Sequence, residues 1–175
     1  NLKMPYGISN FEELITEDYY YVDKTKYIEK LESLPEKRIM FLRPRKFGKT
    51  LFTSVIENYY DKNRVDKFEK LFKNTYIGKN STKLKNSYCI LRFNFSGINT
   101  ETEETTMFGF KEKVSISIYG FTKRYGIDFF VNPEQTVEGI LKSLIEAFSI
   151  QKPNDKIYVI IDEYDHIANE LLGFY

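Results

Sequence analysis

The feature that most constrains this chain is a Gly-Lys-Thr turn placed shortly after a short apolar run. The apolar run covers residues 39–42, and the turn, Gly48-Lys49-Thr50, closes the basic segment that follows it. A strand that ends in such a turn and continues as a helix presents backbone N–H groups and the positive end of the helix to phosphate oxygens. In this pattern the Lys49 ammonium contacts the outer phosphates, the Thr50 hydroxyl binds Mg²⁺, and Gly48 lets the backbone approach closely. The sequence therefore predicts a phosphate-binding loop for ATP and Mg²⁺.

The segment before this turn is irregular. The common pattern G-x-x-x-x-G-K-[ST] has its first glycine where this chain has Arg43, and Pro44 fixes φ and removes one N–H donor. These two residues predict a loop of unusual shape and modest affinity. Arg45 and Lys46 either add charge to the phosphate site or form a solvated basic turn, and the pattern leaves both interpretations open. The predicted nucleotide-binding residues are Arg45, Lys46, Phe47, Gly48, Lys49, Thr50 and Leu51.

A second motif stands where the apolar run 159–161 ends in two acidic residues, Asp162 and Glu163. A carboxylate at the end of a buried strand can hold a water on Mg²⁺, which prefers oxygen ligands in octahedral geometry. Asp162 is therefore the predicted metal residue together with Thr50. Glu163 is predicted to polarise the water that attacks the γ-phosphate, and Lys49 is the other predicted catalytic residue. In the alternative interpretation, Asp162 only caps a helix that begins at Glu163.

Periodicity predicts that strands alternate with helices along the chain. Apolar runs predict strands at 38–42, 88–95 and 157–161. Helices are predicted at 10–15, 25–34, 49–60 and 65–72, over about 18 residues before Gly126, from Thr136 through Phe148, and at 164–172. This order predicts an α/β fold with a mostly parallel sheet covered on both faces, and the uninterrupted run 157–161 predicts a strand buried on both sides. Because ligands of such sheets bind beyond the carboxyl ends of the strands, one pocket can contain both motifs.

Composition narrows the class of protein. A length of 175 residues, with 42% apolar and 29% charged residues, suits one globular domain. A net charge of +1 favours neither nucleic acid nor a membrane surface as a partner. No run reaches the roughly 18 apolar residues of a membrane helix. The single cysteine, Cys89, is predicted to be buried and fits a reducing compartment, so we expect a cytoplasmic protein. The many aromatic residues, 17% of the chain, are predicted to form its core.

The two motifs, together with two segments near the start of the chain, resemble the AAA-ATPase-like family found beside PD-(D/E)XK nuclease domains in bacterial and archaeal proteins. The early segments are Pro5–Phe11 and Tyr20–Thr25. Arg43–Leu51 is similar to the family's Walker A motif, in which arginine replaces the first glycine, and Ile161–Asp165 is similar to its Walker B motif. The resemblance covers nearly the whole chain. It implies a P-loop NTPase fold, a three-layer sandwich, and it implies that Asp23-Lys24-Thr25 packs near the nucleotide.

The resemblance divides the chain into a helical N-terminal segment, residues 1–36, and a nucleotide-binding core, residues 37–175. In the family's class, the strand after Walker B carries a polar sensor residue and lies between the Walker A and Walker B strands. The sequence reaches Tyr175 soon after Glu163. We therefore expect an N-terminal fragment with a sheet incomplete at its C-terminus, and a nuclease-like C-terminal domain in the complete protein. Exposed strand edges invite pairing with another chain, so self-association is a further expectation.

Three functions are open on the sequence. The first is an ATP-binding module that hydrolyses ATP in the complete protein, weakly or not at all as this fragment, and couples its nucleotide state to a partner or an attached domain. Such a module would interact with nucleic acid only indirectly. The second is a nucleic-acid-binding module in which Arg43, Arg45 and Lys46 contact a phosphate backbone, against which the near-neutral net charge weighs. The third is a purely structural interaction module with a degenerate loop.

Overall fold

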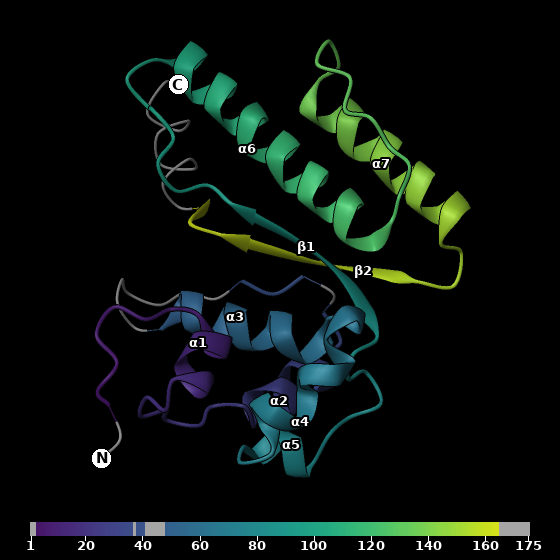
Figure 1. The fold of residues 1–175 in the computed structure, drawn as a ribbon. Coiled ribbons are helices and arrows are strands. Elements are labelled where there is room, and N and C mark those ends of the chain that lie inside the picture. The colour runs from purple at the N-terminus through teal and green to yellow at the C-terminus, as the bar shows by residue number, and fades with distance from the viewer. Residues whose placement is uncertain (1–2, 37, 41–47, 165–175) are drawn as a thin grey trace. The chain divides into compact units, whose positions relative to one another are not determined.

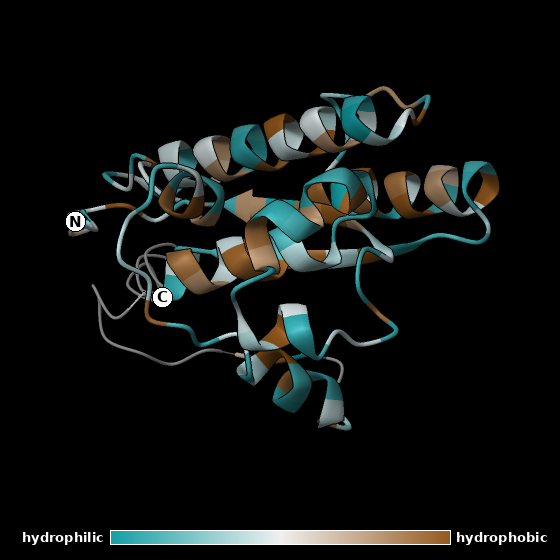
Figure 2. Cartoon of the chain, turned by 60° about the horizontal axis from the view of Figure 1, so that its bottom comes forward, coloured by the Kyte–Doolittle hydropathy of each residue, from teal (hydrophilic) through white to brown (hydrophobic). Residues whose placement is uncertain are grey.

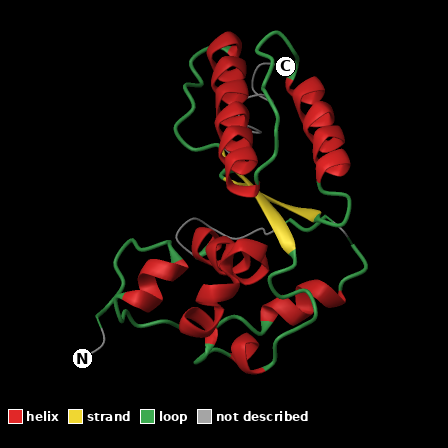
Figure 3. Ribbon diagram, turned by 45° about the vertical axis from the view of Figure 1, so that its right-hand side comes forward, coloured by secondary structure: helices red, strands yellow, loops and turns green. Residues whose placement is uncertain are grey.

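The structure is a computed structural model that describes residues 3–36, 38–40 and 48–164. The chain separates into two compact units, Asn1–Tyr88 and Cys89–Tyr175. Helices make up 51% of the structure and strands 11%. Figure 3 colours the helices red and the strands yellow. This mixture of helix and strand agrees with the predicted α/β class. The predicted division into a segment 1–36 and a core 37–175 stays a prediction.

The first unit is built from helices (Figure 1). They are α1 Phe11–Thr16, α2 Tyr27–Ser33, α3 Lys49–Tyr60, the 3₁₀-helix η1 Lys62–Lys67, α4 Phe68–Phe72 and α5 Tyr76–Lys79. The predicted first helix is present as α1, and Asn10 caps it, because its side chain accepts a hydrogen bond from the Glu13 N–H. The predicted helix 65–72 is instead η1 followed by α4, with Arg64 outside the helical region at φ −114°. Residues 38–40 form no strand, so the first predicted strand is wrong there, and its remaining residues lie outside the described ranges.

Aromatic side chains form the core of the first unit, as predicted. Phe72 of α4 is fully buried. Its ring centroid lies 5.0 Å from that of Phe11 on α1, 5.7 Å from that of Tyr59 on α3 and 5.1 Å from that of Phe68. Aromatic pairs at such separations contribute stabilisation beyond the area they bury. A buried hydroxyl adds to this packing, because Ser54 of α3 accepts a hydrogen bond of 2.9 Å from the Phe11 N–H and docks α1 on α3.

The early segment Asp23–Thr25 caps α5, a helix that the sequence did not predict. Asp23 accepts a hydrogen bond from the Tyr76 N–H at 2.6 Å, and the buried Thr25 hydroxyl accepts one from the Ile77 N–H at 3.1 Å. The helix that follows this segment, α2, has Lys26 as its N-cap, without a side-chain cap. Backbone groups also approach closely here: an ideal Cβ at Gly78 would lie 1.8 Å from the Phe72 carbonyl oxygen, so only glycine fits.

The second unit contains the sheet. Its elements are β1 Tyr88–Asn94, whose first residue belongs to the first unit, α6 Glu103–Tyr125, α7 Val137–Gln151 and β2 Lys156–Asp162. β1 and β2 are neighbours in a parallel two-stranded sheet, which confirms both predicted strands and their parallel arrangement. Figure 1 shows α6 and α7 on the same side of the two strands. Thr102 caps α6 and Thr136 caps α7, and α6 ends at Gly126 in the left-handed region.

One face of this sheet packs on the two helices. The buried cluster there takes Cys89, Leu91 and Phe93 from β1 and apolar residues from α6 and α7, among them Ile118 and Leu144. Burial of Cys89 is as predicted. Around the helices, Figure 2 shows brown apolar residues alternating with teal polar ones, which is the pattern that allows one face to be buried. No helix within the described part of the chain is both long and apolar enough to cross a membrane.

Strand β2 departs from the prediction that it is buried on both sides. Ile160 and Asp162 are buried, but Val159 and Ile161, which alternate with them, are 50% and 51% exposed. Side chains alternate between the two faces of a strand, so Val159 and Ile161 share a face with Ile157, which packs against the cluster of β1, α6 and α7. This face of β2 is therefore only partly covered. The three-layer sandwich therefore remains a proposal. The confirmed part is a mixed helix–strand fold with a parallel pair of strands.

An ion-paired carboxylate in the first unit predicts a pH dependence of stability. Glu12 on α1 accepts hydrogen bonds from Lys67, at 2.7 Å, and from Arg64 of η1. The hydrogen bond from Lys67, together with that from Arg64 and the two positive charges, lowers the pKa of Glu12 although partial burial opposes the shift. A lowered pKa in the folded state stabilises the fold above the unfolded pKa, and this contribution is lost as pH falls through the folded pKa.

We therefore expect Glu12→Gln to lower the free energy of unfolding by about 1 kcal/mol or less at neutral pH, and by progressively less in acid. Urea unfolding at a series of pH values measures this difference. Glu13→Gln, at the exposed neighbouring position, controls for the loss of a charge near the helix N-terminus. If the free energies of unfolding of wild type and Glu12→Gln differ as much in acid as at neutral pH, the prediction is contradicted.

Candidate nucleotide-binding site

The Gly-Lys-Thr turn forms the start of α3. Gly48 is the N-cap residue with φ 78° and ψ 21°, in the left-handed region that favours glycine, and its carbonyl accepts the Phe52 N–H at 2.9 Å. Among the described atoms, a Cβ added at Gly48 would meet nothing within 4 Å. The backbone angle, rather than crowding by the protein, is therefore the reason for glycine at this position.

The N-terminus of α3 differs from those of the other helices. It has no side-chain cap and no acidic residue in its first turn. Of the other α-helices in the described ranges, α1, α2, α4, α6 and α7 have an acidic residue in the first turn, and α5 is capped by Thr75 and by Asp23. The first N–H groups of a helix have no partner within the helix, and together they carry about half a positive charge. The first turn of α3 itself contains no carboxylate that would neutralise this charge.

Three of the predicted residues lie in this first turn. Lys49 and Thr50 are half-buried, as is Leu51. One turn further on, the Thr53 hydroxyl donates to the Thr50 carbonyl at 2.8 Å, which leaves the Thr50 hydroxyl out of this bond. The other predicted nucleotide-binding residues, Arg45, Lys46 and Phe47, lie outside the described residues, as do Arg43 and Pro44.

The second motif lies at the carboxyl end of β2. The side chain of Asp162 is only 5% exposed. One of its carboxylate oxygens, Oδ2, accepts a hydrogen bond from Arg92 Nη2 at 3.0 Å, and the other, Oδ1, accepts one from the Glu163 N–H at 3.1 Å. The Asp162 carbonyl accepts the Phe95 N–H at 3.2 Å, which joins this end of β2 to the end of β1. The carboxylate is therefore held by both strands of the sheet.

Glu163 makes the turn that ends β2. Its φ is 56°, in the left-handed region, which is uncommon for a residue with a side chain. Such conformations cost free energy and are frequent at functional sites. The Asp162 carboxylate stabilises the turn through the Glu163 N–H. Asp162 thus bonds the turn at Glu163, and this bond occupies only part of its acceptor capacity. That Asp162 caps a helix beginning at Glu163 stays an alternative interpretation, because Glu163 itself is not helical.

The structure brings the predicted residues together in two groups. Gly48, Lys49, Thr50 and Leu51 form one group in the first unit, and Asp162 and Glu163 form the other in the second unit. That these groups share one pocket stays a prediction. Within the described ranges, no three His, Cys, Asp or Glu side chains gather as a metal site. This is compatible with Mg²⁺, which proteins usually bind through one or two side chains and the phosphates of a substrate.

Arg92, which forms an ion pair with the predicted metal carboxylate, was not predicted from the sequence. A signal for it was present: β1 is an apolar strand, and a guanidinium within it needs an acidic partner because burying an unpaired charge is costly. In a parallel sheet such a partner is expected on the neighbouring strand. Asp162, the acidic residue that ends β2, meets this requirement.

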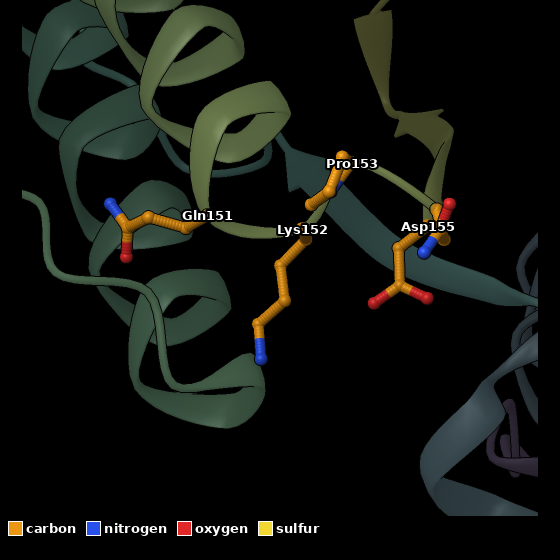
Figure 4. A pocket seen from close by; sticks show the side chains of 5 residues that line it. Gln151, Lys152, Pro153 and Asp155 are labelled. Atoms are coloured by element: carbon orange, nitrogen blue, oxygen red, sulfur yellow. The ribbon is translucent and has the colours of Figure 1, made fainter.

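A surface hollow lies elsewhere in the second unit. Figure 4 shows its lining, the consecutive residues 151–155 that connect α7 to β2. These residues precede the amino end of β2, whereas Asp162 ends the strand. Ligands of parallel sheets bind at the carboxyl ends of strands. The hollow is therefore not the candidate nucleotide site.

These observations define a mixed helix–strand protein with an uncapped Gly-Lys-Thr helix start and a buried aspartate at the end of a parallel strand. The model of the family described as "Predicted AAA-ATPase" matches residues 5–175. The chain therefore belongs to this AAA-ATPase-like family, which confirms the resemblance drawn from the motifs and agrees with a nucleotide-related function. No curated protein and no solved structure matches the chain.

Proposed function

We propose that the chain is an ATP-binding module in which the first turn of α3 holds the phosphates. The observation that carries this proposal is the N-terminus of α3. It has a left-handed glycine, a lysine and a threonine, no side-chain cap and no acidic residue. Free N–H groups and the positive end of a helix favour an anion at this position. The residues present therefore fit a phosphate group, and membership of an AAA-ATPase-like family supports ATP as its source.

Each predicted residue has a distinct role in this proposal. The Lys49 ammonium is a point charge for the outer phosphates, with Arg45, Lys46, Phe47, Gly48 and Leu51 completing the loop around them. The Thr50 hydroxyl is a ligand of Mg²⁺. Asp162 accepts a hydrogen bond from a water on the metal. Glu163 orients and polarises the attacking water. Bound Mg²⁺–ATP supplies the phosphoanhydride bond.

The proposal extends to the complete protein. There we propose that the module hydrolyses ATP and couples its nucleotide state to a partner or to an attached nuclease-like domain. The turn at Glu163 supports a coupling role, because φ 56° is a conformation that costs free energy, and such conformations cluster at active sites and switch regions. Steady-state hydrolysis by the complete protein that is unchanged in Glu163→Gln would contradict this part.

Self-association through the sheet is a related proposal. In the described sheet β1 and β2 are neighbours, so β2 is an edge strand of this sheet, and its Val159 and Ile161 are half-exposed. Such an edge can pair with another chain. Sedimentation showing a monomer at high concentration would count against self-association.

We also propose a cytoplasmic location, which the single buried thiol of Cys89 supports.

The experiment that tests the proposed function is titration calorimetry of the chain with ATP, with and without Mg²⁺. Wild type is expected to bind ATP more tightly when Mg²⁺ is present. Thr50→Ala is expected to lose about tenfold of this gain, about 1.4 kcal/mol, because it lacks the hydroxyl ligand. Thr50→Ser keeps the hydroxyl and is the matched control, expected to bind as wild type does.

Two outcomes would overturn the proposed function. One is a wild type that binds no ATP, and the other is a Thr50→Ala variant whose Mg²⁺-dependent gain equals that of wild type. Single-stranded DNA provides a separate comparison. Salt-dependent DNA binding that persists in excess ATP would favour a nucleic-acid-binding module instead.

A further inference from the structure

We propose that Arg92 is a positioning residue for the predicted metal carboxylate: its guanidinium fixes the orientation of Asp162 and, through Asp162, the turn at Glu163. The inference rests on the proposed function, since the orientation of Asp162 affects Mg²⁺ only if the chain binds Mg²⁺ with a nucleotide. It adds a residue to the site that neither of the two sequence motifs contains.

The Asp162 carboxylate is buried deeply enough to require a partner. The Asp162 side chain is 5% exposed and that of Arg92 is 24% exposed. A buried carboxylate without a partner is strongly destabilising, so Asp162 requires a cation or several hydrogen bonds at this depth. Arg92 supplies the cation at 3.0 Å. Their ion pair is therefore more than a solvated surface contact.

The geometry of the carboxylate also supports a positioning role. Arg92 donates a hydrogen bond to Oδ2 and the Glu163 N–H donates one to Oδ1, so each carboxylate oxygen has its own partner. This fixes both the position and the rotation of the carboxylate. An ionised carboxylate has about four acceptor sites. Two hydrogen bonds therefore leave acceptor capacity that a water on the metal could use.

The strand that carries Arg92 is anchored by the packing of its neighbouring residues. On either side of Arg92, Leu91 and Phe93 are buried in the cluster with α6 and α7. The rings of Phe93 and Phe95 stack with their centroids 5.9 Å apart. Beyond β1, the Phe95 N–H donates to the Asp162 carbonyl and fixes the register of the two strands at this end. The backbone that carries Arg92 is therefore anchored by packing, as a residue that orients another group requires.

Arginine also suits this role better than lysine. A guanidinium presents donors in a rigid planar fork, whereas an ammonium is a point charge on a flexible stem. Groups that orient a metal residue typically change metal affinity by about 10- to 100-fold when they are removed. Arg92→Lys keeps a positive charge beside Asp162 and so keeps the carboxylate paired. It is therefore the variant expected to fold while losing orientation.

The test is calorimetry of the whole chain with ATP at several Mg²⁺ concentrations, for wild type, Arg92→Lys and Arg92→Met, with urea unfolding of each. Without Mg²⁺, all three proteins are expected to bind ATP equally. The Mg²⁺ affinity of the ATP complex is expected to fall about tenfold in Arg92→Met and less in Arg92→Lys. If Arg92→Met does not fold, Arg92→Lys alone decides, with an expected loss of at least about threefold.

The outcomes separate the inference from the function on which it rests. If wild type gains affinity from Mg²⁺ and Arg92→Lys gains equally, the positioning role is overturned and the proposed function stands. A lower free energy of unfolding in either variant, with an unchanged Mg²⁺ affinity, would assign Arg92 a purely structural role and would also overturn it. If wild type gains nothing from Mg²⁺, the proposed function fails and the inference fails with it.

Discussion

Lys49→Ala is expected to weaken ATP binding about 10- to 100-fold, because a hydrogen bond to a charged group contributes about 1.5–3 kcal/mol. Lys49 is the first residue of α3 and directly follows the left-handed Gly48. Its ammonium therefore adds to the positive end of the helix at the position where the phosphates are proposed to bind. Titration calorimetry with Mg²⁺–ATP measures the change in affinity.

A matched control separates this local effect from a change in net charge. Lys70 is exposed on α4, and Lys70→Ala removes the same charge from the same unit. It is expected to bind ATP as wild type does. Far-ultraviolet circular dichroism checks that both variants keep their helices. Equal affinities for wild type and Lys49→Ala would contradict the proposed role of the α3 N-terminus.

The largest effect on stability is expected for Phe72→Ala. Phe72 is fully buried and contacts the rings of Phe11, Tyr59 and Phe68, which lie on α1, α3 and α4. Replacing a buried phenylalanine by alanine removes its transfer free energy and leaves a cavity, at a cost of about 3–5 kcal/mol. Because Phe72 joins three helices, the cavity weakens the support of α3 as well.

Hydrogen exchange of the native protein measures this effect by location. In Phe72→Ala, amides of α1, α3 and α4 are expected to exchange faster. Phe72→Leu keeps most of the apolar volume and is expected to show a smaller increase. Val65→Ala, at a position 63% exposed, is the control for a change in an apolar residue without a cavity. If Phe72→Ala and Val65→Ala exchange alike, Phe72 does not hold this core together.

Elements with strong local signals could be predicted from the sequence. The bounds of α3 follow from the Gly-Lys-Thr start and an apolar face of regular spacing, and the structure places this helix at the predicted residues. The caps at Asn10 and Thr136 are local as well, because each side chain bonds an N–H three residues further on. Both strands of the sheet were visible as apolar runs between turn residues.

Features that depend on distant residues could not be predicted. α5 is four residues long and is stabilised by Asp23 and Thr25, about fifty residues earlier in the chain. The exposure of Val159 and Ile161 depends on what covers β2, which an apolar run does not show. In the candidate site, the residue types of both motifs were evident. The ion pair of Arg92 with Asp162 requires the pairing of two strands whose order the sequence leaves open.

We propose that the Gly-Lys-Thr turn and the Asp162 motif bind one metal–nucleotide complex. Replacing Mg²⁺ by Mn²⁺ tests it directly, because the paramagnetic ion broadens the nuclear magnetic resonance signals of nearby amides. With ATP and Mn²⁺ present, we expect strong broadening of the amide signals of both Thr50 and Glu163, and recovery of both in Lys49→Ala. Broadening at only one of these two positions, or at neither, would contradict it.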